Sequence, residues 1–286
     1  MFPKEAGRSW SALFGFSGLG LALGEGAVSE QVLEVQSLSL SFKGVRALNQ
    51  VSFSVGAGDF FAVIGPNGAG KTSLLNVLSG LYRPQGGSVH FMGQDVSHIS
   101  PQSRARLGLG RTFQNLELFR GMSVLDNVKL GADLALPGYP ALRPRASTEW
   151  KIRSWAEEVL EYLHLSPYRS LPAGTLPYGL QKRVEVARAL AGRPRLLLLD
   201  EPMAGLSLEE KQDLARFLLD AQREWGVTLL WVEHDLRAVL ELSNKVLVIS
   251  YGEVLYLGRP EGVRTDRRVA EAYLGVAREA GPGDKV

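Results

Sequence analysis

The residues best suited to chemistry form a glycine-rich run that ends in lysine and threonine. Residues 65–72 read Gly-Pro-Asn-Gly-Ala-Gly-Lys-Thr. Glycines at both ends let a loop wrap closely, so that successive main-chain N–H groups point at a phosphate. The lysine supplies a charge for the outer phosphates, and the threonine hydroxyl is a ligand for Mg²⁺. The pattern predicts a phosphate-binding loop made of Gly65, Pro66, Asn67, Gly68, Ala69, Gly70, Lys71, Thr72 and Ser73.

An acidic pair further along the chain supplies what such a loop needs for hydrolysis. Residues 196–199 are four leucines, and Asp200 and Glu201 follow them directly. A carboxylate at the end of a buried strand can hold Mg²⁺, and its neighbour can orient and polarise an attacking water molecule. We assign Asp200 to the metal and Glu201 to catalysis. Together the two motifs predict an ATPase that uses ATP and Mg²⁺.

The elements around these motifs indicate an α/β fold. Residues 60–64 are continuously apolar, as in a strand that is buried on both faces, and they run straight into the glycine-rich loop. Leucine and valine recur at helical spacing after Lys71. Buried strands are expected at 196–199, 228–232 and 246–249, and shorter β-rich runs occur at 32–35, 38–42 and 51–55. Strand, loop and helix in this order are the context that a phosphate-binding loop requires.

The region 115–184 has a different character. It lacks strand-like runs, has amphipathic stretches at 123–134 and 148–163, and contains a proline-rich loop at 137–144. We interpret it as a helical subdomain inserted into an ATP-binding domain that spans 32–258. The remaining residues, 259–286, are expected to form a charged tail that is helical around 269–280.

Composition narrows the classes of partner. The chain has 286 residues, with 32 Lys and Arg against 30 Asp and Glu, so it lacks the bulk basic field that nucleic-acid binding usually requires. It has no cysteine, which excludes disulfides and cysteine-ligated metals. It has no apolar run of 18 residues, so any membrane role should be peripheral. Residues 1–31 resemble a crude signal peptide, but Glu5 and several glycines weaken that interpretation, and we expect a disordered extension or a wrongly assigned start.

Further motifs lie between the loop and the tail in a fixed order. Residues 111–114 read Arg-Thr-Phe-Gln, proline follows the acidic pair, and residues 233–235 read Glu-His-Asp. Over about residues 32–275 the chain resembles ATP-binding cassette (ABC) proteins. That resemblance implies a RecA-like P-loop core with an antiparallel β subdomain and a helical subdomain. It also implies that Gln114 contacts Mg²⁺ and links the site to a transport partner, that His234 contacts the γ-phosphate, and that Phe42 stacks on adenine.

Plainer interpretations of these three residues stay open. Gln114 could be a surface amide, Phe42 a core residue of its strand, and His234 the first residue of a helix. A polar residue on a loop in the right order is more often a site residue, which favours the functional interpretation for Gln114 and His234.

The family's signature segment, Leu-Ser-Gly-Gly-Gln, closes over the nucleotide of the opposite subunit, and this chain departs from it. Residues 176–181 read Leu-Pro-Tyr-Gly-Leu-Gln. Pro177 has neither a hydroxyl nor an N–H group, and Tyr178 replaces a glycine. Gly179 remains ahead of an expected helix, whose N-terminus can still face a phosphate in trans. Ser207 stands where the family has an aspartate. Both departures fall on surfaces that act in trans.

The same departures narrow the resemblance to one group of ABC proteins. Leu-x-Tyr-Gly, Arg-Thr-Phe-Gln, the Ala-Gly-Leu at 204–206 and the ending Ala-Tyr-Leu-Gly at 272–275 are similar to ATP-binding subunits of branched-chain amino acid importers. This implies a second cassette in a heterodimer, two membrane-spanning permease subunits, and an extracytoplasmic solute-binding protein that acts through the permease. It also implies a peripheral location on the cytoplasmic face of the inner membrane, and no nucleic acid partner.

Other functions share part of this pattern. Importers of urea or short amides have much of it. ABC ATPases of DNA repair or translation generally carry two cassettes, coiled coils or zinc-bearing inserts, and this chain has one cassette, no heptads and no cysteine. The altered 176–180 segment would suit a subunit that binds ATP but hardly hydrolyses it, whereas Glu201 and His234 argue for hydrolysis.

Overall fold

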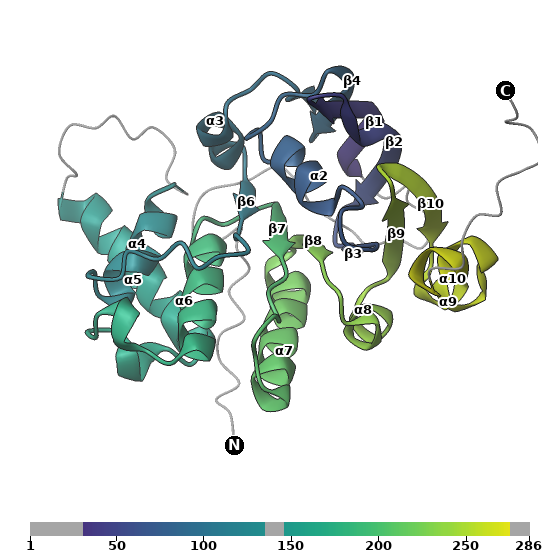
Figure 1. Ribbon diagram of the computed structural model, residues 1–286. Coiled ribbons are helices and arrows are strands. Elements are labelled where there is room, and N and C mark those ends of the chain that lie inside the picture. The colour runs from purple at the N-terminus through teal and green to yellow at the C-terminus, as the bar shows by residue number, and fades with distance from the viewer. Residues whose placement is uncertain (1–30, 135–145, 275–286) are drawn as a thin grey trace, which may run out of the picture. The chain divides into compact units, whose positions relative to one another are not determined.

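The computed structural model describes residues 31–134 and 146–274 (Figure 1). The expectations for the first 30 residues, for the loop 137–144 and for the tail beyond residue 274 lie outside these ranges. All described residues belong to one compact unit that begins at Gln31. Within that unit, none of the described helices combines the length and apolar character that crossing a membrane requires.

A six-stranded sheet carries the glycine-rich loop, the acidic pair and His234 just beyond its strand ends. Its strand order is β10-β9-β3-β8-β7-β6, parallel throughout except that β10 pairs antiparallel with β9. The strands are β3 (Phe60–Ile64), β6 (Leu109–Arg111), β7 (Leu196–Asp200), β8 (Thr228–Val232), β9 (Lys245–Ser250) and β10 (Glu253–Gly258). Every residue of the central strands β3, β7 and β8 is buried, as their unbroken apolar sequences predict.

Alternate residues of β3 join two separate cores because successive side chains point to opposite faces of the sheet. Phe60 packs with Trp231 at 4.9 Å between ring centroids, in the core that includes the helices from α4 (Val124–Leu134) to α8 (Leu236–Leu242). Phe61 stacks on Phe53 at 5.4 Å, in the core shared with a second, antiparallel sheet and helix α2 (Lys71–Leu78). The strand that leads into the glycine-rich loop is therefore fixed from both sides.

The second sheet is antiparallel, with strand order β2-β1-β4-β5. It consists of β1 (Gln31–Phe42), β2 (Val45–Gly56), β4 (Gly86–Phe91) and β5 (Gln94–Asp95). The runs 32–35 and 38–42, predicted as two strands, form the single strand β1. Its register shifts between Val35 and Leu38, where Ser37 has a φ of 47°. The break in the apolar pattern therefore marks a bulge and not the end of a strand.

The inserted region folds as three helices that lie together beside β6 (Figure 1). They are α4 (Val124–Leu134), α5 (Ala146–Tyr162) and α6 (Tyr178–Ala191), with 3₁₀ turns at Ser166–Tyr168 and Ala173–Thr175. Fully buried Asn127 fixes the chain ahead of α4, since its amide donates to the carbonyl oxygens of Phe119 and Ser123, both at 3.0 Å. Helices α4 and α5 form where the amphipathic spacing predicts them.

The remaining helices are α2 (Lys71–Leu78), α3 (Pro101–Arg106), α7 (Leu208–Trp225), α8 (Leu236–Leu242), α9 (Pro260–Thr265) and α10 (Arg267–Leu274). Helix α7 begins with a capping box in which the side chains of Ser207 and Glu210 bind each other's main-chain N–H group. In the predicted tail, Val263 and Val269 are buried in the main core. The described part of that tail is thus packed helix. The α/β fold class with an antiparallel sheet is confirmed.

Candidate functional site

The glycine-rich loop joins β3 to α2 in a turn that only glycine fits at two positions. A Cβ atom at Gly65 would collide with the carbonyl oxygen of Ile249, and one at Gly70 with that of Ala47. Gly70 also has a φ of 104°, in the left-handed region. The first bond within the helix runs from the N–H of Leu74 to the carbonyl of Gly70, at 2.8 Å. The three preceding N–H groups, of Lys71, Thr72 and Ser73, therefore precede the helical ladder and are suited to an anion.

Lys71 folds back over its own loop. Its Nζ donates to the carbonyl oxygens of Gly65 at 2.7 Å and Pro66 at 2.9 Å, and the residue is only 7% exposed. Burial lowers the pKa of this ammonium, and the nearby carboxylates of Glu201 and Asp200 oppose that shift. The lysine of the loop is therefore within electrostatic range of both members of the predicted acidic pair.

The other loop residues differ in exposure. Asn67 and Gly68 form an exposed tip, Pro66 is half-buried, and Ala69 is buried. The carbonyl of Ala69 accepts the N–H of Gly252 from the turn between β9 and β10, at 2.9 Å. That turn anchors the loop to the sheet. In the first turn of α2, Thr72 is exposed and Ser73 is half-buried, so the threonine hydroxyl is open to a ligand.

Asp200 ends β7 as a buried carboxylate with one oxygen unused. Its Oδ2 lies 3.5 Å from Nη2 of Arg111, whereas Oδ1 has no hydrogen-bond partner. The residue is 2% exposed, and burial raises the pKa of the carboxyl, opposed by the Arg111 guanidinium. A buried, unpaired carboxylate oxygen is costly unless it binds a cation or a donor. Carboxylate, hydroxyl and amide oxygens are ligand types that Mg²⁺ prefers, so the chemistry of Asp200, Thr72 and Gln114 fits the predicted metal role.

Glu201 gathers the two other predicted catalytic residues around its carboxylate. Its Oε1 lies 2.7 Å from Nε2 of His234, and its Oε2 accepts a hydrogen bond from Nε2 of Gln114 at 3.4 Å. Glu201 has a φ of 48°, a left-handed conformation that is unusual for a residue with a side chain. The N–H group of Glu201 donates to the carbonyl of Val232 at 3.0 Å, which holds this backbone against β8.

Helix α6 holds the main chain beside Gln114. The carboxylate of Glu185 accepts the N–H of Phe113 at 3.2 Å, and Nζ of Lys182 donates to the carbonyl of Gln114 at 3.4 Å. Both α6 side chains are only 2% exposed and lie 3.8 Å apart, and burial raises the pKa of Glu185. The helix that begins at the signature segment thus continues to the segment of Gln114.

Sequence reasoning assigned no role to two residues that help to build the site. Arg111 donates to the carbonyl of Leu75 at 3.0 Å and to the hydroxyl of Ser79, besides its contact with Asp200. Glu233 is 4% exposed, and its two oxygens accept the N–H groups of Met203 and His234. Both stand inside the motifs 111–114 and 233–235. In the sequence, the only indication of their roles is that they stand in the same motifs as Gln114 and His234.

The segment predicted to act in trans is exposed at Pro177 and Tyr178, and Gly179 lies inside α6 and not ahead of it. The helix begins at Tyr178 after Pro177, without a side-chain cap, and Tyr178 is 46% exposed. A Cβ atom at Gly179 would collide with the carboxylate of Glu210 at the start of α7, which is therefore very close to the first turn of α6.

Phe42 stands apart from this group. It ends β1, is 43% exposed, and its ring meets the ring of Tyr82 edge-on at 5.2 Å between centroids. Among the described residues, neither a hydrogen bond nor a ring contact connects it to the loop residues or to Glu201. An exposed ring at a strand end is able to stack on a flat ligand, which a buried core residue is not.

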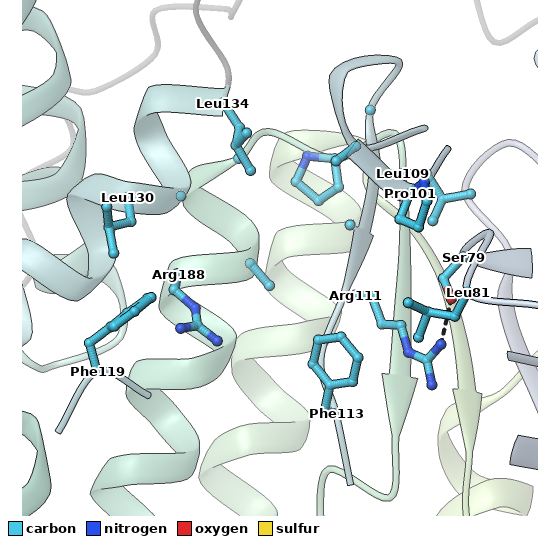
Figure 2. A pocket seen from close by; sticks show the side chains of 17 residues that line it. Ser79, Leu81, Pro101, Leu109, Arg111, Phe113, Phe119, Leu130, Leu134 and Arg188 are labelled. Atoms are coloured by element: carbon cyan, nitrogen blue, oxygen red, sulfur yellow. Dashed lines mark hydrogen bonds between the residues drawn. The ribbon is translucent and has the colours of Figure 1, made fainter. Parts of the chain in front are cut away.

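A cavity of about 350 Å³ opens between the inserted helices and α3 with β6 (Figure 2). Leu130 and Leu134 of α4 and Phe119 line one side, and each is at least 40% exposed. Arg111 and Phe113 lie on the other side, and in Figure 2 the guanidinium of Arg111 points away toward Ser79. The cavity therefore borders both the segment of Gln114 and the arginine that contacts Asp200.

Comparisons with known proteins identify the family of this chain. The sequence model of the ABC transporter family matches residues 48–204. The chain is 38% identical over 258 residues to the high-affinity branched-chain amino acid transport ATP-binding protein BraF of Pseudomonas aeruginosa, covering 87% of this chain and all of BraF. It is 36% identical over 258 residues to the corresponding protein LivG of Escherichia coli K12, with the same coverage.

Solved structures give the same result. A nucleotide-free ATP-binding cassette from an ABC transporter superposes with a TM-score of 0.75 at 32% identity, over 85% of this chain and 98% of the other. The ADP conformation of such a cassette superposes with a TM-score of 0.76, also at 32% identity, over 86% and 99% of the two chains. The chain belongs to the ABC transporter family, as one of its ATP-binding cassettes.

Proposed function

We propose that this cassette hydrolyses ATP to drive the import of branched-chain amino acids. The observation that carries the proposal is the position of Glu201, whose carboxylate is bonded to His234 and Gln114 next to the metal-binding candidate Asp200. The names of BraF and LivG, which match almost the whole described chain, supply the class of solute.

In this function the loop 65–73 binds the phosphates. Its main-chain N–H groups and Lys71 would contact phosphate oxygens, and Thr72, Gln114 and Asp200 would hold Mg²⁺. Bound Mg²⁺ would neutralise charge on the β- and γ-phosphates. Glu201 accepts a proton from the attacking water while His234 and Gln114 keep its carboxylate in place. Phe42 supports the adenine base by stacking.

The second nucleotide-facing surface of the chain acts on a partner cassette. The segments 176–180 and 204–207 are close to each other, since Gly205 lies against the ring of the exposed Tyr178. Gly179, in the first turn of α6, offers its main-chain N–H group to a phosphate held by another chain. Because Pro177 and Ser207 depart from the family's pattern, we propose a heterodimer, in which the partner contributes a different segment in return.

We further propose that the cavity of Figure 2 receives a segment of the membrane-spanning permease. The exposed apolar side chains of Phe119, Leu130 and Leu134 suit an apolar helix, and the cavity borders the segment that carries Gln114. Two permease subunits would hold the cassettes at the cytoplasmic face of the inner membrane. An extracytoplasmic binding protein would deliver the solute through them.

The test replaces Glu201 by glutamine, which keeps the shape and removes the base. We expect the rate of phosphate release to fall by about 100-fold or more while ATP binding is retained, because only the transition state needs the carboxylate. Glu224→Gln is the matched control, because Glu224 is exposed and lies near the C-terminal end of α7. It should leave the rate unchanged. Equal rates in Glu201→Gln and wild type would remove the catalytic role of Glu201.

The solute class has its own test. The tagged chain, purified from its native membrane in mild detergent, should bring down two membrane subunits and a second cassette. In proteoliposomes, a leucine-loaded binding protein should raise the ATPase rate of this complex, whereas a urea-binding protein should not. If only the urea-binding protein raised the ATPase rate, the proposed solute would be a short amide and not a branched-chain amino acid.

A further inference from the structure

Glu233 is a buried carboxylate that none of the catalytic roles above uses. It follows β8 directly and is 4% exposed. Its Oε1 accepts the N–H of Met203 at 3.0 Å, and its Oε2 accepts the N–H of His234 at 3.2 Å. One side chain therefore bonds the main chain of two segments, one after β7 and one after β8.

These two segments stand on either side of the bond between Glu201 and His234. Met203 lies two residues after Glu201, in the turn that the N–H of Ala204 closes on the carbonyl of Glu201 at 3.2 Å. His234 contributes the ring nitrogen that lies 2.7 Å from Glu201. Glu233 therefore bonds the main chain next to both members of the Glu201–His234 pair.

The chemistry of the site requires a carboxylate at this position. An ionised carboxylate has only acceptors, so both of its oxygens can serve N–H groups. A glutamine has one oxygen and one NH₂ group, and the NH₂ group would face an N–H donor. Burial raises the pKa of Glu233 and the two N–H bonds lower it, while Glu201 and His234 face it with opposing effects.

We propose that Glu233 is a positioning residue that sets the distance between His234 and the carboxylate of Glu201. It also ties this pair to the 203–207 segment, because the carbonyl of Met203 accepts the N–H of Leu206 at 3.3 Å. The trans-facing segment would then move together with the catalytic pair. This inference rests on the proposed ATPase function, which assigns the chemistry to Glu201.

The experiment compares Glu233→Gln with wild type in the full chain. We expect kcat for ATP hydrolysis to fall about tenfold with KM for ATP within about twofold, because alignment is lost and the phosphate loop is untouched. The imidazole nitrogen signals of His234 in NMR spectra, identified by their loss in His234→Gln, should shift at constant pH. Glu233→Asp, a shorter carboxylate that keeps both acceptors, should recover part of the rate.

Asp59 provides the matched control. It is a buried carboxylate at the opposite, amino-terminal end of β3, and it accepts the N–H of Gly56 at 2.7 Å. Asp59→Asn should lower the melting temperature but leave kcat and the His234 signals unchanged. If Glu233→Gln behaves in the same way, Glu233 only stabilises the fold and the proposal is wrong. The NMR comparison needs no turnover, so a chain that bound ATP without hydrolysing it would refute the proposed ATPase and still leave this test decisive.

Discussion

Gln114 and His234 both contact the carboxylate of Glu201, whereas Tyr178, Gly205 and Ser207 in segments 176–180 and 204–207 are exposed to solvent. Glu201 meets His234 at 2.7 Å, and its own N–H is bonded to β8. Tyr178 is 46% exposed, at a helix start without a side-chain cap. We propose that the first region binds nucleotide within one chain, and that the second acts only when another chain supplies a phosphate. We therefore expect the single cassette to bind ATP, and we expect the rate of ATP hydrolysis to depend on the pair of cassettes.

The largest expected effect is in the first region. Lys71→Met keeps the length of the side chain and removes its charge. We expect ATP affinity to fall by about 100-fold, since the charge that faces the outer phosphates is lost. The fold should not suffer, because burial already disfavours this ammonium. Titration with a fluorescent ATP analogue measures the affinity, and thermal melting checks the fold. Unchanged affinity would move the phosphate site away from this loop.

A smaller effect is expected from Gly179→Ala in the second region. The added methyl group displaces the carboxylate of Glu210 and so disturbs both the first turn of α6 and the capping box of α7. We expect the ATPase rate of the assembled pair to fall about tenfold, with unchanged ATP binding by the single chain. Phosphate release and analogue titration separate the two quantities. A loss of binding in the single chain would show that the two regions are not separable.

The smallest effect concerns stability. Burial raises the pKa of Asp200 in the folded chain above its unfolded value. Relative to an uncharged variant, the wild type therefore keeps its full stability below the unfolded pKa and loses stability as pH rises through the folded pKa. Asp200→Asn should be more stable than wild type by about 1 kcal/mol in mildly alkaline buffer and equal to it in acid.

Denaturant unfolding at several pH values measures this gain. Asp213→Asn on α7 is the control, because Asp213 is 36% exposed and pairs with Arg183. It should show no gain at any pH. If Asp200→Asn were more stable than wild type by the same amount at every pH, the buried charge of Asp200 would not be the cause. The burial of this carboxylate would then cost less free energy than its geometry indicates.

The sequence predicts most of the first region because its residues follow buried strands. The unbroken apolar runs before Gly65 and Asp200 indicate central parallel strands, and such strands end at one edge of a sheet. The order of motifs then brings Gln114 and His234 to the same edge. The roles of Arg111 and Glu233 could not be predicted in this way, because a side chain that bonds to distant main chain has no local pattern.

The antiparallel sheet was harder to predict for a different reason. Strands β4 and β5 are short, exposed on one face and rich in glycine and polar residues, so their apolar alternation is weak. The helix start at Tyr178 was also misplaced. Proline at 177 fits just before a first helical turn, and that signal should have put Gly179 within the helix.

The left-handed backbone of Glu201 has a practical consequence for engineering. A residue with a side chain in this conformation costs on the order of 1 kcal/mol, and glycine would relieve the strain. A library of this chain selected only for heat resistance should therefore enrich Glu201→Gly. A screen for more heat-resistant variants of this cassette therefore needs an ATPase assay at every round, because selection for thermal stability alone would favour inactive variants.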